Sequence, residues 1–197
     1  MTELVIASAN LHKIRELRAM LKPLKFSDIL SLLQFPDYQP LPEEGASFEA
    51  NAIAKAEHAA RVLQKWVLAD DSGLVVPALN GMPGIQSHRY AGSEATDAEN
   101  RAKLLGEMKQ LQGLERSAYF ECALALASPE GVKKSVVSTC HGSIALGERG
   151  RNGFGYDAVF VKSDYEKTFA EIDESTKTRI SHRRKAMDRL LSALEML

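Results

Sequence analysis

The order of apolar and polar positions along the chain predicts alternating strands and helices, which is typical of an α/β protein. An apolar run at residues 4–7 precedes apolar positions at helical spacing over residues 14–24, so we expect a buried strand that leads into a helix capped near Asn10. One continuous apolar stripe over the Ala-rich residues 47–65 predicts a long amphipathic helix. The apolar run at residues 66–69 predicts a second buried strand.

Two regions in the middle of the chain differ in how clearly their sequence predicts secondary structure. Residues 24–44 contain prolines at positions 36, 40 and 42 and show no periodicity, so we expect a loop that holds one short strand at most. Thr96 and Glu99 have the spacing of a capping box, which predicts a helix from Thr96 to about residue 112.

The last third of the chain predicts a hairpin, a strand and a helix. Alternating runs at residues 117–127 and 132–146 flank the turn sequence Ser-Pro-Glu-Gly at 128–131, which indicates a β-hairpin. A Gly-rich passage then leads to a strand over residues 158–161. The chain ends in one predicted amphipathic helix, whose apolar stripe includes Ile180, Met187, Leu190, Leu191 and Leu194.

Composition narrows the class of protein. A chain of 197 residues that is 45% apolar predicts a single domain, residues 1–197, whose hydrophobic core is large enough to fold without disulfides or a structural metal. Its 25 basic and 26 acidic residues leave no positive excess for binding nucleic acid. Cys122 and Cys140 fit reduced core thiols. No apolar run approaches the roughly 20 residues of a membrane span, and residues 1–10 lack the features of a signal peptide, so we expect a cytoplasmic protein without a membrane partner.

The first candidate site is the junction at residues 8–13, between the first strand and the first helix. Backbone N–H groups and the positive end of the helix dipole favour an anion there, and Lys13 adds a full charge. Ser8 and Asn10 offer hydrogen bonds to the same anion. The alternative is an ordinary helix cap beside a solvated Lys13.

The second candidate is Asp70-Asp71, which we expect where a buried strand ends at the edge of the sheet. Adjacent carboxylates repel each other unless a cation, a proton or hydrogen-bond donors relieve them, and Mg²⁺ is one such cation. The alternative is an Asx turn before Gly73. Glu43 offers a further carboxylate, although the Glu43-Glu44 pair taken alone is typical of a solvated loop.

Three further features fit a bound nucleotide. The basic run at residues 177–185 lies at the start of the predicted last helix, where cations oppose the helix dipole, so it is a candidate phosphate site. Phe154 offers a plane for stacking a base, and Lys55 offers a charge on the Ala-rich helix. The alternatives are a solvated basic face, a core phenylalanine and a lysine whose stem covers apolar surface.

Taken in order, these pieces resemble the inosine/xanthosine triphosphate pyrophosphatases, which hydrolyse non-standard purine nucleotides. The resemblance covers nearly the whole chain, whereas the P-loop, dinucleotide-binding, zinc-protease and serine-hydrolase motifs are absent from it. The matching segments are Ser8–Lys13, Glu43–Phe48, Asn51–Ala56, Ala69–Leu74, Pro83–Ile85, Arg89–Gly92, Gly153–Asp157, Lys177 and Ser181–Arg183.

The resemblance implies an elongated mixed β-sheet with flanking helices, in two lobes around a nucleotide cleft. It also implies a homodimer, dependence on Mg²⁺, Asp71 as general base and metal ligand, and Glu43 as a carboxylate that assists the metal. Triphosphate contacts fall at Ser8, Asn10 and Lys13, and base or sugar contacts at Phe154–Asp157. The full set expected to bind substrate is Ser8, Ala9, Asn10, Leu11, His12, Lys13, Lys55, Ser72, Phe154, Gly155, Tyr156, Asp157, Lys177, His182 and Arg183.

The chain departs from the family pattern at three positions. Ala9 and His12 replace glycines, and a side chain there is costly if the loop needs a positive φ. Ala50 stands where the family tends to carry Glu, which removes the second half of a capping box with Ser47, and Glu49 is the nearest substitute.

The expected reaction is attack of water on the α-phosphorus of ITP, dITP or XTP, which gives the monophosphate and pyrophosphate and removes deaminated purines from the nucleotide pool. One alternative is a related pyrophosphatase that acts on pyrimidine or modified nucleotides, since only the base pocket would differ. A nucleotide-sensing module without turnover is the other alternative.

Overall fold

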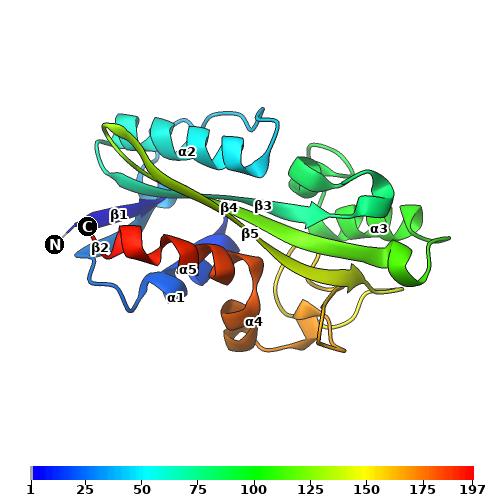
Figure 1. Cartoon of the computed structure of the whole chain (residues 1–197). Helices are drawn as coiled ribbons and strands as arrows, with labels where there is room; N and C mark the ends of the chain where they lie inside the picture. The colour runs from blue at the N-terminus through cyan, green and yellow to red at the C-terminus, as the bar shows by residue number, and fades with distance from the viewer. Residues whose placement is uncertain (1) are drawn as a thin grey trace. The chain divides into compact units, whose positions relative to one another are not determined.

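A computed structural model describes residues 2–197 and contains a six-stranded sheet in the order β2-β1-β3-β4-β5-β6 (Figure 1). β1 pairs in parallel with both β2 and β3, whereas β5 pairs antiparallel with β6, so the expected mixed sheet is confirmed. The strands are β1 (Glu3–Ile6), β2 (Asp28–Ser31), β3 (Trp66–Val75), β4 (Ser117–Ser128), β5 (Gly131–Ile144) and β6 (Phe160–Lys162).

Five α-helices accompany the sheet in the described part of the chain. They are α1 (Leu11–Leu21), α2 (Phe48–Leu63), α3 (Asp97–Glu107), α4 (Glu174–Ile180) and α5 (His182–Leu194). Short 3₁₀ segments lie at Leu32–Gln34, Pro77–Leu79, Gly84–Arg89, Gly113–Arg116 and Phe169–Glu171. Within residues 2–197, no helix has the length and apolar character needed to span a membrane.

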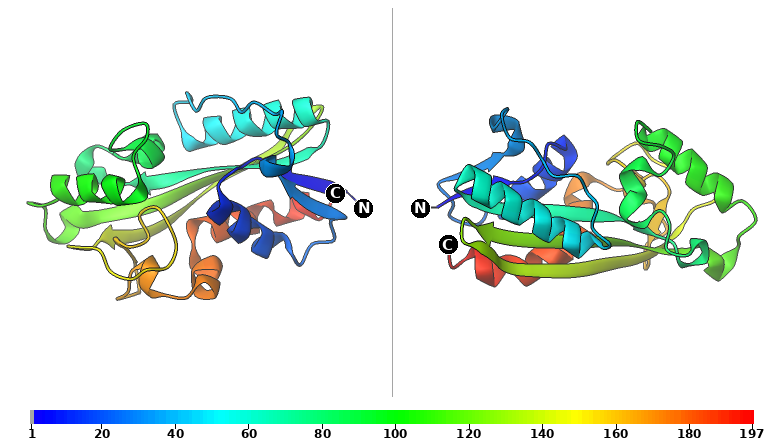
Figure 2. Two further views of the ribbon diagram at one scale, coloured as in Figure 1. Left: turned by 180° about the vertical axis from the view of Figure 1, so that it is seen from behind. Right: turned by 90° about the horizontal axis from the view of Figure 1, so that it is seen from above.

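The chain forms two compact units, each made of segments that are distant in sequence. The first unit comprises residues 1–71, 122–138 and 183–197, and the second comprises residues 72–121 and 139–182. In the first unit, α1 and α5 lie on one face of the strands and α2 on the other (Figures 1 and 2). Its main core joins the strands to α1 and α5, whereas aromatic and aliphatic side chains around α3 and β6 form the core of the second unit.

Most local expectations are confirmed because they depend on neighbours in sequence. Asn10, Ser47 and Thr96 cap α1, α2 and α3 through their side chains, and Thr96 completes the predicted capping box with Glu99. The hairpin of β4 and β5 turns at residues 129–130 as expected. The loop over residues 24–44 holds the short strand β2, and β6 overlaps the strand expected at 158–161.

Three expected boundaries are wrong. α3 ends at Glu107 rather than near residue 112. The final helical region is two helices, because Ser181 has an extended backbone (φ −73°, ψ 165°) that separates α4 from α5. The expected end of β3 after Ala69 is also wrong, since the strand continues to Val75 and Asp70-Asp71 lies within it. The Asx-turn alternative for this pair is excluded by the same strand.

The capping box of α3 makes the first prediction. Replacing Thr96 with Ala removes the acceptor for the Glu99 N–H (3.3 Å), so we expect a loss of about 0.5–2 kcal/mol in the free energy of unfolding. Urea unfolding followed by circular dichroism measures it. Thr96→Ser retains the hydroxyl and should lie within a few tenths of a kcal/mol of the unmodified protein; an equal loss in both variants would contradict the capping role.

Candidate functional site

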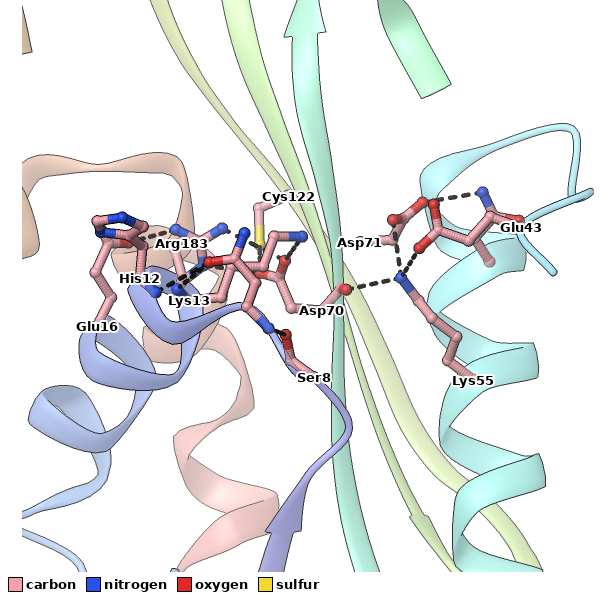
Figure 3. A network of polar contacts seen from close by, with 12 residues as sticks. Ser8, His12, Lys13, Glu16, Glu43, Lys55, Asp70, Asp71, Cys122 and Arg183 are labelled. Carbon is pink, nitrogen blue, oxygen red and sulfur yellow. Dashed lines mark hydrogen bonds and ion pairs between the residues drawn. The ribbon is translucent and has the colours of Figure 1, made fainter. Parts of the chain in front are cut away.

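β3 directs two adjacent carboxylates to separate partners in the first unit. Successive side chains of a strand point to opposite faces, so Asp70 and Asp71 do not share a site (Figure 3). The side chain of Asp70 contacts Lys13 of α1 (2.6 Å) and Arg183 of α5 (2.8 Å), whereas that of Asp71 contacts Lys55 of α2 (2.9 Å). Both aspartates are buried, with 2% and 5% of their surface exposed. Each carboxylate is therefore relieved by a cation on its own side.

The Asp70 side is a buried network of alternating charge. Arg183 donates through Nε to Asp70 and through Nη1 to Glu16, which lies one turn after Lys13 on α1. The thiol of Cys122 on β4 donates to Asp70 Oδ2 (3.3 Å). Two carboxylates and two cations give this cluster no net charge, which lowers the cost of burying it.

Opposing effects set the pKa of Asp70. Burial alone would raise it, but the attraction of Arg183 and then of Lys13 is stronger and holds the pKa of this carboxyl well below its usual range. Burial and the neighbouring Asp70 charge also raise the pKa of the Cys122 thiol. Asp70 thus remains a carboxylate at neutral pH, and Cys122 remains a protonated donor to it.

The Asp71 side depends on the ammonium group of Lys55. Lys55 Nζ lies 2.9 Å from Asp71 Oδ1, 2.8 Å from Glu43 Oε1 and 3.0 Å from the carbonyl oxygen of Asp70 (Figure 3). Because the ammonium group of Lys55 is paired, the alternative of a lysine that covers apolar surface with its stem and extends its head group into water is wrong. Asn51, one turn earlier on α2, donates to the other oxygen of Asp71 (3.0 Å).

Asp71 differs from Asp70 in the balance of its surroundings. Burial raises the pKa of Asp71, and the attraction of Lys55 is partly cancelled by repulsion from Glu43, so the pKa stays above its ordinary value. Burial lowers the pKa of Lys55, but Asp71 and Glu43 together raise it above normal. A carboxylate with a raised pKa accepts a proton more readily, as a general base requires.

The start of α1 is an ordinary helix cap with an unusual lysine. Asn10 Oδ1 accepts hydrogen bonds from the N–H groups of His12 (2.9 Å) and Lys13 (3.2 Å), and Ser8 Oγ accepts from Asn10 N (3.1 Å). Lys13 is not the solvated residue of the alternative interpretation, because its ammonium binds Asp70 and only 18% of the side chain is exposed.

The replacement of two family glycines causes no backbone strain. Among residues 2–197, the non-glycine residues with positive φ are Gln64, Asn80 and Asp164, so neither Ala9 nor His12 requires the left-handed conformation.

The residues near Asp71 fit a hard divalent cation. Glu43 and Asp71 converge on Lys55 from a loop and a strand, and Mg²⁺ requires only one or two protein carboxylates when substrate phosphates supply further oxygens. Across the described residues, no group of three or more His, Cys, Asp or Glu side chains could hold an ion by itself. Glu49, expected as the nearest substitute for the missing family glutamate, accepts a hydrogen bond from Ser135 Oγ (2.6 Å), and Ser47 Oγ accepts from Ala50 N (3.1 Å).

In the second unit, Asp157 organises the residues expected to contact the base. Its Oδ2 accepts from Lys177 Nζ (2.6 Å) and from the N–H of Phe154 (2.9 Å). The ammonium of Lys177 lies 4.6 Å from the centre of the Phe154 ring. A Cβ at Gly153 would lie 2.0 Å from Asp157 Oδ2, so this position requires glycine. The expected site residues Phe154, Asp157 and Lys177 therefore lie together.

His182 is held by an aromatic stack in the same unit. Its ring lies 4.6 Å from that of Phe120, at an interplanar angle of 14°. The solvated-face interpretation of residues 177–185 is wrong for Lys177, His182 and Arg183, which are all buried. Ser72 lies in β3 and is half-buried.

Sequence reasoning missed four residues that complete these networks: Glu16, Asn51, Phe120 and Cys122. Glu16 and Arg183 are 167 positions apart, so no local pattern pairs them. The one available signal was Asn51, which lies in a segment that carried the family resemblance.

Comparison with known proteins gives full-length matches. The model of the Ham1 family matches residues 4–193. The dITP/XTP pyrophosphatase of Protochlamydia amoebophila is 61% identical over 99% of this chain and 98% of its own length, and that of Chlamydia abortus is 50% identical over 99% and 95%. A HAM1 protein structure from Coxiella burnetii matches with a TM-score of 0.88 at 39% identity over 100% of both chains. The Ham1 protein of Staphylococcus aureus matches with a TM-score of 0.85 at 41% identity over 98% of each chain.

The buried cluster around Asp70 generates a prediction about stability. Arg183→Leu leaves the carboxylates of Asp70 and Glu16 without their shared cation, so we expect a loss of about 3–5 kcal/mol in the free energy of unfolding at pH 7. The control Arg184→Leu removes the exposed pair with Asp188 (2.6 Å) and should cost about 0–1 kcal/mol. Equal losses in the two variants, measured by urea unfolding, would contradict the buried pairing.

Arg183→Leu should also change how the free energy of unfolding depends on pH. A folded-state pKa below the unfolded value stabilises the protein above the unfolded pKa, and this stability is lost as pH falls through the folded pKa. The depressed pKa of Asp70 therefore makes the unmodified protein less stable below about pH 4, whereas Arg183→Leu loses the part of this contribution that comes from Arg183 and keeps the part that comes from Lys13. The stability difference between the two proteins should shrink on acidification, which unfolding curves at pH 7 and pH 3 would measure.

Proposed function

This chain belongs to the Ham1 family, and we propose that it hydrolyses non-standard purine nucleoside triphosphates with the help of Mg²⁺. The products are the nucleoside monophosphate and pyrophosphate, and dITP, ITP and XTP are the proposed substrates. The observation that carries the proposal is the pair of carboxylates, Asp71 and Glu43, joined by the ammonium of Lys55 in a chain whose full-length relatives are named dITP/XTP pyrophosphatase. Hydrolysis removes deaminated purines before they enter DNA and RNA.

Asp71 is the proposed general base. It takes a proton from the water whose oxygen forms a bond to the α-phosphorus, while the bond from that phosphorus to the bridging oxygen breaks and pyrophosphate leaves. The ammonium of Lys55 lies 2.9 Å from one oxygen of this carboxylate. Burial raises the pKa of Asp71, which brings the proton affinity of its carboxylate closer to that of an efficient general base at neutral pH.

Glu43 and Asp71 would hold Mg²⁺. When bound, the ion supplies positive charge that neutralises the phosphate oxygens and the leaving pyrophosphate. Both side chains provide carboxylate oxygens, the ligand type that Mg²⁺ prefers. Lys55 keeps the two carboxylates near each other despite their repulsion.

The residues at the start of α1 are the proposed triphosphate contacts. Lys13 carries its charge at the beginning of the helix, where the dipole also favours anions. Asp70 holds the ammonium of Lys13 in place, and a phosphate group would compete for it. Ser8, Ala9, Asn10, Leu11 and His12 complete the proposed phosphate loop.

Base selection is the proposed role of the second-unit residues. Phe154 offers a stacking surface, and Lys177 and His182 carry donors that suit the six-position carbonyl of hypoxanthine and xanthine. Adenine presents an amino donor at that position, and buried donors left without an acceptor cost about 1–3 kcal/mol each. Ser72, Gly155, Tyr156 and Asp157 belong to the same proposed pocket. Arg183, which pairs with Asp70 in the first unit, is also a proposed substrate contact.

On the basis of the family resemblance, we also propose that the protein forms a homodimer and that it acts in the cytoplasm.

A substrate screen tests the function directly. We expect pyrophosphate release from dITP, ITP and XTP to exceed that from ATP and GTP by at least about 10²-fold in kcat/KM. Release should stop when EDTA removes Mg²⁺ and return when Mg²⁺ is restored. Equal kcat/KM for ATP and ITP would contradict the proposed selectivity, and faster turnover of a pyrimidine nucleotide would assign the protein to another substrate class.

The two aspartates should separate under mutation. Asp71→Asn removes the proton acceptor, so we expect kcat to fall by about 10²–10⁴-fold while the protein stays folded. Asp70→Asn removes the partner of Lys13 and Arg183, so its main effect should be lower stability, with a smaller fall in kcat. Steady-state assays and thermal unfolding measure the two effects. Wild-type turnover in Asp71→Asn at matched Mg²⁺ would remove Asp71 from the mechanism.

A further inference from the structure

Asn51 lies between Asp71 and the loop that carries Glu43. It belongs to the first turn of α2 and has 3% of its surface exposed. Its Oδ1 accepts a hydrogen bond from the N–H of Gly45 (2.7 Å), and its Nδ2 donates to Asp71 Oδ2 (3.0 Å). One side chain thus binds both the strand that carries one carboxylate and the loop that carries the other.

The chemistry of its partners fixes the orientation of this amide. The backbone N–H of Gly45 is only a donor, so it must face the amide oxygen of Asn51. A carboxylate is only an acceptor, so Asp71 must face the amide nitrogen. Turning the amide by 180° would place two donors together on one side and two acceptors together on the other.

Gly45 is the residue that permits this close approach. A Cβ at position 45 would lie 2.4 Å from Asn51 Oδ1, a distance at which the amide must move. Gly45 is not among the glycines with positive φ, so its backbone conformation is open to alanine and only the missing side chain matters. The same Cβ would lie 3.1 Å from Asn51 N and 3.2 Å from the Ala50 Cβ, so the Asn51 amide oxygen is the nearest of three close atoms and the tightest constraint on this position.

Asn51 and Lys55 divide the two oxygens of Asp71 between them. They are four residues apart on α2 and so lie on the same side of the helix. Lys55 holds Asp71 Oδ1 and also reaches the side chain of Glu43, whereas Asn51 holds Asp71 Oδ2 and reaches the backbone two residues after Glu43. Both links connect the same strand, helix and loop.

We infer that Asn51 is a positioning residue for catalysis, which fixes the rotation of the Asp71 carboxylate and the placement of the Glu43 loop. This inference rests on the proposed pyrophosphatase function. A carboxylate held by Lys55 alone can turn about its side-chain bonds, and a displacement of about 1 Å at a reacting group can cost about 10²-fold in rate. Asn51 acts on turnover without belonging to the proposed base or phosphate contacts.

A double-mutant cycle between Gly45 and Asn51 tests the inference. Asn51→Ala should lower kcat for dITP by about 10–10²-fold and leave KM within about 3-fold, because substrate contacts are retained. Gly45→Ala should also lower kcat, although it adds no group that reaches substrate, since its Cβ displaces the Asn51 amide. In the double variant, Gly45→Ala should add less than about a 2-fold further loss, because the atom it displaces is gone.

Asn100 supplies a matched control in the second unit. It is 2% exposed, accepts from the Ala91 N–H (2.8 Å) and donates to the His88 carbonyl (3.0 Å), but it contacts no carboxylate. Asn100→Ala should lower the melting temperature and leave kcat within about 2-fold of wild type. Circular dichroism and thermal unfolding of all variants show which are folded at the assay temperature, and Gly45→Ala tests the inference if Asn51→Ala does not fold.

Three outcomes would overturn the inference, two of them from the Gly45 and Asn51 variants and one from the control. The first is a folded Asn51→Ala or Gly45→Ala with wild-type kcat, and the second is a double variant in which the two losses multiply. The third is an Asn100→Ala variant whose kcat falls in proportion to its loss of stability. In that case the effect of Asn51→Ala on kcat would follow from lost stability alone. Absence of pyrophosphate release by the wild-type protein from dITP, ITP and XTP would instead refute the proposed function itself.

Discussion

The alternation of side chains along β3 is the constraint on which both sides of the candidate site depend. Two adjacent buried aspartates in one strand must point to opposite faces, and each must find its own cation there. Lys13 and Arg183 come from the helices on one face, and Lys55 comes from the helix on the other (Figure 3). The strand therefore requires helices with basic residues on both faces of the sheet.

This arrangement gives the two neighbouring aspartates different proton affinities. Asp70 is surrounded by two cations, so its pKa is depressed and its charge is permanent at neutral pH. Asp71 shares one cation with Glu43, and burial raises its pKa. The first therefore stabilises the arrangement of α1 and α5, whereas the second retains the proton affinity that a base needs.

Sequence reasoning succeeded where a structural feature depends on a few neighbouring residues. The caps at Asn10, Ser47 and Thr96 and the β4–β5 turn are of this kind. It failed at β3, where the acidic pair before Gly73 has the local pattern of a turn but lies within a strand, with cations from distant parts of the chain beside both carboxylates. It also failed to find Glu16, whose pairing with Arg183 depends on the folded chain alone. Residue patterns supplied the candidates at residues 8–13, at Asp70-Asp71 and at residues 177–185, the family resemblance supplied the roles expected for them, and the structure supplied their neighbours.

The two units also separate two kinds of chemistry. Asp71, Glu43 and Lys55, the proposed groups for proton transfer and metal binding, belong to the first unit, while Phe154, Lys177 and His182, the proposed base contacts, belong to the second. Each group has its own buried support: Asn51 for the carboxylate, and Asp157 and Phe120 for the lysine and histidine. Because the supports do not overlap, we expect substitutions around Asp157 or Phe120 to affect the proposed base contacts without moving the proposed general base.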